Sequence, residues 1–429
     1  MEKKSILAPG MAAVSEVKGL SMSVADSWRE VCDKVRKQFP GRLVDVRMLQ
    51  HGASVRCLQA SGSTEASPEA ATPRYNMGCI QALPEAVVLE LLFAEGIVDP
   101  AAPLGDYLPE LVMSGGRPLT EGIRVRDVLS HATGYHTPSK LMESRSFEEV
   151  VLYLQNKVPA FPPGTVCSWN NLGRHILEEL VRRTTGKDVS QLIQELLHDV
   201  SVSEAVVHRE KSGWLDIELS LDELTTFISR TLGPGGVGSA LMTRVADVSV
   251  PVVRRPVSSR SGYPVAYAHG IARYPDKLWG QNGVGSTYTL GVRFNQEVSF
   301  LNCLAVEAGP FARDLVLQLL AGAAGYIRDP SPVHAVGAIV DCDIASLAGN
   351  YIADGEERIT VAVAHDRIAC VVLRGDERIA SIPLSLSENN ILLADVRWST
   401  LQIEFFPHPE SGVACLVLGQ VCYVKSDAL

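Results

Sequence analysis

Cys79 is the residue whose type and setting are best suited to covalent chemistry. It opens the segment CIQALPEAVVLELLFAE, which is apolar on all sides and stops before Gly96, a pattern that predicts a buried helix. Proline is tolerated only near the start of a helix, so Pro84 places that start close to Cys79. A thiolate forms at about pH 8.5 unaided, and a helix N-terminus lowers that value. Apolar neighbours such as Ile80 and Trp169 act in the opposite direction and raise the pKa of the thiol.

The other cysteines and the charge of the chain exclude several function classes. The nine cysteines contain no CxxC pair and no Cys/His spacing typical of zinc, so we expect neither a metal nor a cofactor. An odd number of scattered thiols predicts a reducing, cytoplasmic setting. No signal-like apolar segment and no run of 18 apolar residues is present, and the net charge is −10 without a Lys/Arg run. We therefore expect no nucleic-acid partner and no membrane partner.

The order of patterns along the chain predicts two domains. A helix over 24–39 is followed by two strands, and the polar segment 60–75 predicts a flexible loop. Helical patterns over 172–197, split at Thr185-Gly186, precede three strands between 260 and 308, the first of them YAHGIARY. After a proline-bearing linker, short alternating runs predict a small antiparallel β-barrel. We expect one domain over 1–330 and the barrel over 340–429.

Five stretches together resemble the serine β-lactamase-related family of class C β-lactamases, DD-peptidases, esterases and transacylases. YNMGCIQALPEAVVLELLFAEGIVDPAAPLGDYLPEL is similar to the family's nucleophile helix, and GIRVRDVLSHATGYH to its LLxHxSG stretch. FPPGTVCSWNNLGRHILEELVRRTTGKDV resembles the family's Tyr-x-Asn segment, and LWGQNGVGSTYTLGV its (K/H)xG strand. LAGNYIADGEERITVAV resembles the opening of the lipocalin-like β domain of family esterases. The resemblance covers roughly residues 70–429 and implies a central antiparallel sheet flanked by helices, plus a small all-β C-terminal domain.

The chain departs from this family at its catalytic positions. The Ser-x-x-Lys tetrad becomes Cys79 to Ala82, so the nucleophile is a thiol and the lysine is missing. Ala82 is either native or a replacement of a lysine that would have paired with the thiol. Trp169 stands where the family has tyrosine, while Asn171 is kept. Gln281 stands where the family has a cation.

The resemblance also implies how the remaining site would work. The backbone N–H groups of Cys79 and Val284 would form an oxyanion hole, because backbone donors survive side-chain replacement. Trp169 would line the acyl pocket, and Asn171, Gln281 and Gly283 would contact the substrate. With no cation near the Gln281 strand, we expect poor carboxylate recognition and no β-lactam hydrolysis.

Three functions remain open at this point. The first is an intracellular acyltransferase or hydrolase of specialised metabolism, in which Cys79 forms an acyl-thioester with a small-molecule ester, thioester or amide that is possibly carrier-bound. The second is a non-catalytic member that uses its cleft for binding. The third is a cyclisation-promoting member in which the pocket shapes the substrate and Cys79 is incidental.

The simplest interpretation of the remaining cysteines and histidines is that they have structural roles. Cys370, Cys415 and Cys422 lie in β runs and are expected in the core, with Cys167 a weaker second candidate for a reactive thiol. His136 is the best remaining base, although a solvated loop histidine is the simpler interpretation. His131, His175 and His269 are expected to serve packing.

Overall fold

The computed structural model describes most of the chain from residue 22 to residue 426. The described residues are 22–50, 53–59, 61–62, 72–111, 122–135, 146–155, 159, 162–165, 167, 172–209, 215–247, 250–251, 266–274, 277–285, 287–307, 310–326, 335–339, 344–352, 357–364, 367–374, 376–386, 391–395, 403–407, 414–418 and 421–426.

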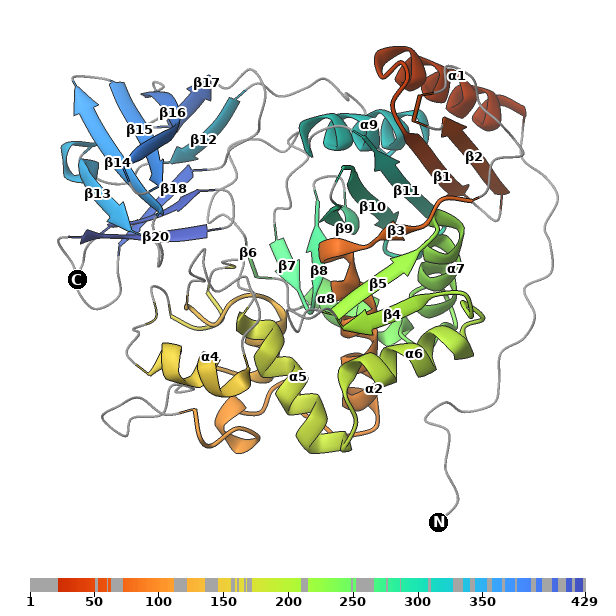
Figure 1. Ribbon diagram of the computed structural model, residues 1–429, viewed down its shortest axis with the longest axis horizontal. Helices are drawn as coiled ribbons and strands as arrows, with labels where there is room; N and C mark the ends of the chain where they lie inside the picture. The colour runs from red at the N-terminus through yellow and green to blue at the C-terminus, as the bar shows by residue number, and fades with distance from the viewer. Residues whose placement is uncertain are drawn as a thin grey trace.

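An eight-stranded antiparallel sheet forms the centre of the larger part of the molecule (Figure 1). Its strands, in spatial order, are β2 (Ala53–Gln59), β1 (Val44–Gln50), β11 (Phe300–Val306), β10 (Thr289–Asn295), β9 (Leu278–Val284), β8 (Ile271–Arg273), β7 (Ala266–Ala268) and β6 (Val250–Pro251). Every pair of neighbours is antiparallel. The predicted central antiparallel sheet is confirmed.

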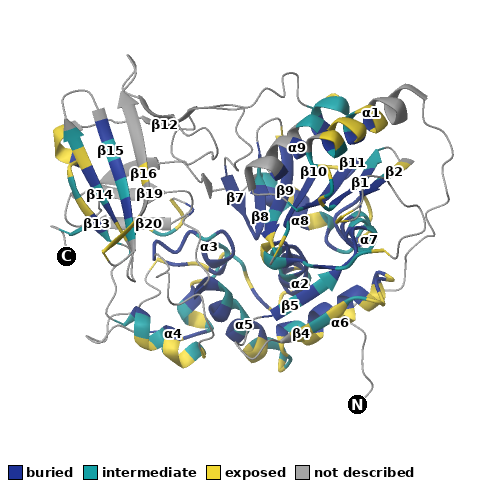
Figure 2. Ribbon diagram, turned by 45° about the horizontal axis from the view of Figure 1, so that its top comes forward, coloured by how far each residue is buried: buried dark blue, intermediate teal, exposed yellow. Residues whose placement is uncertain are grey.

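Both faces of this sheet are covered by helices. Alternate residues of β1, such as Val44, Val46 and Met48, face α1 (Met22–Gln38) and α9 (Pro310–Ala323) on one side. The opposite face packs against α2 (Ala82–Ala94), α7 (Leu221–Thr231) and α8 (Ser239–Asp247). The strands are accordingly buried along most of their length, and the outer sides of α1 and α6 are exposed (Figure 2).

A helical region with a small sheet completes this part of the chain. Its helices are η2 (Leu104–Asp106), α3 (Val125–Leu129), α4 (Phe147–Leu154), α5 (Leu172–Thr185) and α6 (Val189–Asp199). Its three-stranded sheet has the order β3 (Tyr75–Asn76), β5 (Leu215–Leu219) and β4 (Val206–Arg209). The predicted break at Thr185-Gly186 is confirmed, because Gly186 adopts φ +71°, a left-handed conformation that ends α5.

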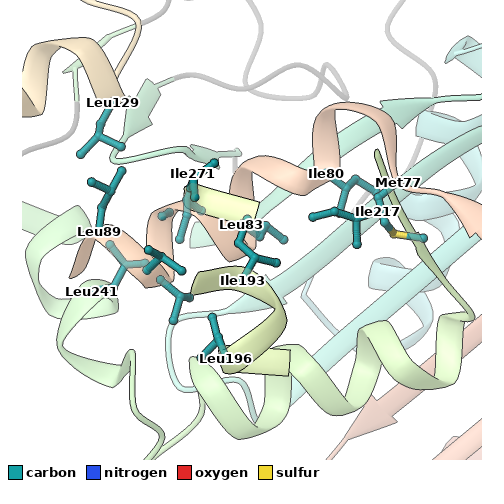
Figure 3. Packing of buried hydrophobic residues seen from close by; sticks show 14 of the residues in the cluster. Met77, Ile80, Leu83, Leu89, Leu129, Ile193, Leu196, Ile217, Leu241 and Ile271 are labelled. Carbon is teal, nitrogen blue, oxygen red and sulfur yellow. The ribbon is translucent and has the colours of Figure 1, made fainter. Parts of the chain in front are cut away.

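The apolar helix α2 is buried between the two sheets, as its all-round hydrophobicity predicted. It is preceded by a single 3₁₀ turn, η1 (Gly78–Gln81), so Cys79 lies in that turn and not in the first turn of the α-helix. Leu83 and Leu89 of α2 pack against α6, α8 and β8 through Ile193, Leu241 and Ile271 (Figure 3). Pro84 costs no hydrogen bond, because the first turn of a helix has free N–H groups.

The segment YAHGIARY, predicted as one strand, is a tight hairpin. β7 and β8 pair through Ala268 and Ile271, and the two turn residues His269 and Gly270 have φ values of 47° and 82°. Two successive positive φ angles are typical of the turn type that suits the twist of a hairpin. The sequence pattern did not indicate a turn, because the first of these positions holds a histidine and not one of the usual turn residues.

The C-terminal part of the chain is all-β, as predicted. One nine-stranded antiparallel sheet contains, in spatial order, β12 (Ala335–Ile339), β17 (Ile391–Asp395), β16 (Glu377–Leu386), β15 (Arg367–Arg374), β14 (Glu357–Ala364), β13 (Gly349–Ile352), β20 (Val421–Lys425), β19 (Ala414–Leu418) and β18 (Ile403–Pro407). The two outer strands β12 and β18 also lie against each other, which curls the sheet toward a barrel. Its first strand, β12, starts ahead of residue 340. The turn η5 (Ile344–Leu347) connects β12 to β13 in the chain.

Candidate active site

The turn η1 presents Cys79 outward while its neighbours anchor it. Met77, Ile80 and Gln81 are buried, whereas Cys79 is exposed. Met77 and Ile80 lie in the packed interior together with Leu83 and Ile217 (Figure 3). The one side chain of η1 that is free to meet a ligand is therefore a thiol.

Asn76 shapes the backbone that leads into this turn. Its side-chain Oδ1 accepts a hydrogen bond from the Gly78 N–H at 2.8 Å, closing a local side-chain turn. The Asn76 backbone N–H donates to the hydroxyl of Tyr288 at 2.7 Å, and the Tyr288 ring packs edge-on against Tyr75. These contacts attach the start of η1 to the β9–β10 hairpin.

Glycine is required at position 78 for two independent reasons. Gly78 has φ +49°, a conformation that L side chains rarely adopt. A Cβ atom at this position would lie 2.7 Å from the Val284 carbonyl oxygen and 3.1 Å from the Val284 nitrogen. Gly283 is equally close-packed, since a Cβ there would lie 2.4 Å from the Met77 carbonyl oxygen. The end of β9 and the turn η1 thus approach each other backbone to backbone.

This approach brings the backbone of Val284 next to the turn that carries Cys79. The first helical bond of η1 runs from the Ile80 N–H to the Met77 carbonyl at 3.0 Å, so the N–H of Cys79 precedes the bonds of the helix. On β9, the Gly285 N–H donates across the hairpin to Tyr288 at 2.9 Å. Successive N–H groups of a strand point to opposite sides, so the N–H of Val284 points away from β10, toward η1. The oxyanion hole of Cys79 and Val284 stays a prediction, which the close approach of the Val284 backbone to η1 supports.

The protein around Cys79 holds the pKa of its thiol above the ordinary value. Desolvation is the largest cause, because protein atoms surround a side chain that is still accessible to solvent. The positive charges of Arg174 and Arg313 oppose this effect, as does the N–H of Cys79 itself, while Glu85 reinforces it. Of the two opposing influences expected from the sequence, the apolar surroundings prevail over the helix terminus.

Arg174 on α5 is a site residue that the sequence analysis missed. Its guanidinium forms an ion pair with Glu85 of α2 at 2.5 Å, and both side chains are mostly buried, with exposed fractions of 11% and 14%. With its amide oriented to satisfy both neighbours, Gln81 of η1 accepts from the same guanidinium and donates to the Leu215 carbonyl. A lone arginine beside the buried Leu172, Gly173 and Ile176 was the available signal in the sequence.

The position of the missing lysine lies against the β7–β8 turn. The carbonyl oxygen of Ala82 is 3.1 Å from where a Cβ of Gly270 would stand. Gln281 lies on the same face of the sheet and is buried, and its amide accepts from the Tyr267 hydroxyl at 3.0 Å and donates to the Gly270 carbonyl at 3.2 Å. In this arrangement the Gln281 side chain is fully engaged in hydrogen bonds to β7 and to the β7–β8 turn. A contact with substrate would require one of these bonds to break.

A cation lies on the strand beside Gln281, but on the other face of the sheet. Arg293 of β10 is buried, donates to the Asn282 side-chain oxygen at 2.9 Å, and stacks over the Tyr274 ring at 3.4 Å. Asn282 alternates with Gln281 along β9, so Arg293 occupies the sheet face that carries α9. Arg313 of α9 is buried on this side as well.

Several predicted residues lie outside the described part of the chain. These are Trp169, Asn171 and His136. Cys167 is described and is 1% exposed in an apolar cluster, where burial raises the pKa of its thiol, so it is a core residue. Cys370 is also buried, whereas for Cys415 and Cys422 only the strand position is described.

Of the three histidines expected to serve packing, two are buried. His269 is 1% exposed, and burial lowers its pKa to about 4. His131 packs edge-on against Tyr267, and His175 is buried on α5. Within the described ranges, no group of three or more His, Cys, Asp or Glu side chains could hold a metal ion.

Comparison with known proteins agrees with this geometry. The family model described as Beta-lactamase matches residues 49–215, which include η1, α2 and α5. This part of the chain is similar to the Beta-lactamase family. A search of curated protein sequences finds no match.

Solved structures of the β-lactamase-like fold resemble the chain over most of its length. A crystal structure of SurE with D-Leu matches with a TM-score of 0.67 at 17% identity, covering 94% of this chain and 100% of that one. The octameric penicillin-binding protein homologue from Pyrococcus abyssi gives a TM-score of 0.54 at 14% identity, with 93% and 99% covered. The β-lactamase/D-alanine carboxypeptidase from Yersinia pestis gives 0.56 at 14% identity, with 70% and 98% covered. The fold is therefore the β-lactamase/transpeptidase-like fold, in which hydrolases are common, and the first two likenesses extend over nearly the whole chain.

None of the described helices combines the length and the apolar character that a membrane span requires.

Proposed function

We propose that this protein is an acyl-transfer enzyme in which Cys79 carries the acyl group as a thioester. The observation that carries the proposal is the close approach of the Gly78 and Val284 backbones next to an exposed thiol, which supports an oxyanion hole made by the N–H groups of Cys79 and Val284. A buried structural cysteine would need neither the exposure nor this close approach.

The reaction follows from these groups. The Cys79 thiolate attacks the acyl carbonyl carbon, and the carbonyl π electrons move to oxygen, where the N–H groups of Cys79 and Val284 stabilise the negative charge. The carbon–leaving-group bond then breaks, and the leaving group takes a proton from solvent. Water, an amine or an alcohol attacks the resulting thioester and loses a proton, and the thiolate departs.

The acidity of the thiol favours activated acyl donors. Because the pKa of Cys79 is raised, few molecules carry the thiolate at neutral pH, but a less acidic thiol is a stronger nucleophile once ionised. Exchange between a thioester donor and an enzyme thiol is nearly balanced in energy, whereas an unactivated amide would have to be converted uphill. We therefore propose a small-molecule acyl thioester or activated ester as the donor, including one attached to a carrier.

An aminoacyl or peptidyl group is the first acyl class to test. The SurE structure contains D-Leu, and its fold matches 94% of this chain.

Intact-mass spectrometry with activated donors tests the proposal. The full chain is incubated with N-acetylcysteamine thioesters of D- and L-amino acids and of simple fatty acids, followed by peptide mapping. We expect one acyl adduct at Cys79, absent in Cys79→Ala, while Cys303→Ala keeps the adduct because Cys303 is buried. Absence of any adduct at Cys79 with every donor would overturn the proposal.

The second candidate is a binding protein that keeps the fold without the chemistry. The raised pKa of the Cys79 thiol and the loss of the family lysine at Ala82 favour it. It predicts that Cys79→Ala binds the same acyl compounds with unchanged affinity and that the native chain never turns them over. A cyclisation reaction that bypasses the thiol would instead be recognised by products that form equally in Cys79→Ala.

A further inference from the structure

A buried carboxylate on the central sheet contacts the strand that leads into the turn η1. Asp45 of β1 is 1% exposed, and its Oδ2 accepts a hydrogen bond from the Tyr75 hydroxyl of β3 at 3.0 Å. Its other oxygen, Oδ1, lies 3.7 Å from the Nε of Arg56 on β2, which is beyond hydrogen-bond length. Burial of a carboxylate costs free energy unless the group is well paired, so one hydrogen bond and one distant cation compensate this cost only in part. The proposed acyl transfer has so far assigned no role to Asp45.

The strand β3, which consists of Tyr75 and Asn76, connects the two sheets of the larger part of the molecule. On one side it pairs with β5 of the three-stranded sheet. On the other side two hydrogen bonds join it to the central sheet and its hairpin: the Tyr75 hydroxyl donates to Asp45, and the Asn76 N–H donates to the Tyr288 hydroxyl at 2.7 Å. Only one residue separates β3 from the start of η1. A displacement of β3 therefore displaces η1 relative to the central sheet.

The oxyanion hole proposed for Cys79 depends on the distance between these same elements. Cys79 belongs to η1 and Val284 to β9 of the central sheet, and the backbones of Gly78 and Val284 approach each other closely. An N–H group stabilises an oxyanion only at about 2.7–3.1 Å, so a shift of η1 by about 0.5 Å is enough to weaken this interaction. An anchor of β3 on the central sheet consequently affects the rate of acylation and not only the stability of the fold.

We propose that Asp45 is a positioning residue for the acyl transfer, which holds β3, and with it η1, at the correct distance from β9 through the Tyr75 hydroxyl. The inference rests on the proposed function, because it concerns the geometry of the oxyanion hole. A carboxylate suits this role, since a hydrogen bond from a hydroxyl to a carboxylate is roughly twice as strong as one between neutral groups. The rings of Tyr75 and Tyr288 pack edge-on with centroids 5.2 Å apart, which extends the anchor to the β9–β10 hairpin.

The strength of this anchor depends on pH, because Asp45 forms the strong hydrogen bond only when it is ionised. The charged and titratable side chains around it are Tyr75 of β3, Arg47 of β1, Arg56 of β2, Asp222 of α7 and Cys303 of β11. Desolvation raises the pKa of Asp45 to about 6, against the opposing effects of the two arginines and the Tyr75 hydrogen bond. Asp222 acts in the same direction as desolvation, and Cys303 stays neutral because burial raises its pKa to about 12. Asp45 is therefore ionised at neutral pH and takes up a proton as the pH falls through its pKa.

Two reactions of the Cys79 thiol in the full chain test this role. Acylation by an N-acetylcysteamine thioester needs the oxyanion hole, whereas alkylation by iodoacetamide needs only the thiolate and access to it. The ratio of the acylation rate to the alkylation rate therefore cancels the thiolate fraction. We expect Tyr75→Phe, which keeps the ring contact with Tyr288, to lower this ratio about 5–20-fold at pH 7.5. Glu90→Gln changes an equally buried carboxylate in the second half of α2, and as the matched control it should leave the ratio unchanged.

The pH dependence of this ratio separates positioning from general destabilisation. Between pH 7.5 and pH 5.5 the ratio should fall about 2–3-fold in the native chain, because Asp45 becomes protonated and its bond to Tyr75 weakens. It should stay level in Asp45→Asn, whose amide oxygen does not titrate. An unchanged ratio in Tyr75→Phe, or the same pH dependence in Asp45→Asn as in the native chain, would overturn the inference and leave the proposed function standing. A native chain that forms no acyl adduct with any donor would overturn both.

Discussion

Two thiols on opposite faces of the central sheet differ in access. Cys79 is exposed, yet desolvation by the surrounding protein raises the pKa of its thiol. Cys57 of β2 is 2% exposed and lies in one buried cluster with Cys32 of α1. One face of the sheet thus carries a thiol that a donor can reach, and the other face a thiol that packs in the interior.

This contrast separates a thiol that can meet a substrate from one that cannot. Cys79 has an open approach, although its thiolate is scarce at neutral pH. Cys57 lacks the approach. Acyl transfer needs the first arrangement, because the donor must enter.

Closing the space between η1 and β9 should have the largest effect on the rate of Cys79 acylation. Gly78→Ala forces a Cβ against the Val284 backbone, displacing one oxyanion donor, and we expect acylation of Cys79 to slow about 100–1,000-fold. Stopped-flow measurement of acyl-adduct formation checks this.

Gly186→Ala is the matched control for that change. Gly186 also has a positive φ, +71°, but no atom lies within 4 Å of its Cβ position, so the variant carries the backbone strain alone. It should acylate at the native rate. If Gly78→Ala also acylated at the native rate, the Cys79–Val284 oxyanion hole would be wrong.

The pH dependence of Cys79 alkylation should show the raised pKa directly. With that pKa above its ordinary value, the thiol is almost wholly protonated at pH 7. The rate with iodoacetamide should then rise about tenfold per pH unit and still be rising at pH 9. A plateau below pH 8 would show that the helix terminus and the cations lower the pKa of Cys79 by more than desolvation raises it.

Arg174→Gln should shift the pH profile of Cys79 alkylation to higher pH. Loss of a cation that favours the thiolate should lower the alkylation rate at pH 8 by about 3–10-fold, and Arg174→Lys should restore much of it. The Arg174→Gln, Glu85→Gln double variant removes the unpaired carboxylate and isolates the effect of the cation. Arg182→Gln, exposed at the far end of α5, is the control and should leave the profile unchanged.

Tyr288→Phe should have the smallest effect. It removes the acceptor of the Asn76 N–H while keeping the ring contact with Tyr75, so we expect about 1 kcal/mol less stability and a few-fold slower acylation. Thermal unfolding and adduct kinetics check the two parts. Tyr326→Phe, whose hydroxyl accepts a hydrogen bond from Asn295, should lower stability without slowing acylation.

The fold could be predicted from the sequence to a large extent. The apolar segment after Cys79, the stop at Gly186 and the alternating runs of the C-terminal part each follow from local periodicity and turn residues, and each is present in the structure. The β7–β8 hairpin escaped prediction because its first turn residue is His269 with positive φ, which residue preferences assign to other conformations.

The site could be predicted only as a set of positions. The sequence alone determined that a cysteine stands at the start of the buried helix, that Ala82 and Gln281 replace the cations of the resembled family, and that Gly283 precedes Val284. These are properties of residue types in order, and local patterns are sufficient to identify them.

Only the tertiary structure decided what surrounds the thiols. Glu85, Arg174 and Arg313, which lie on α2, α5 and α9, all act on the pKa of Cys79. A pKa depends on desolvation and on charges a few ångströms away, and most of these come from residues far along the chain. The sequence therefore places the Cys79 thiol, and the packing of distant helices sets how acidic this thiol is.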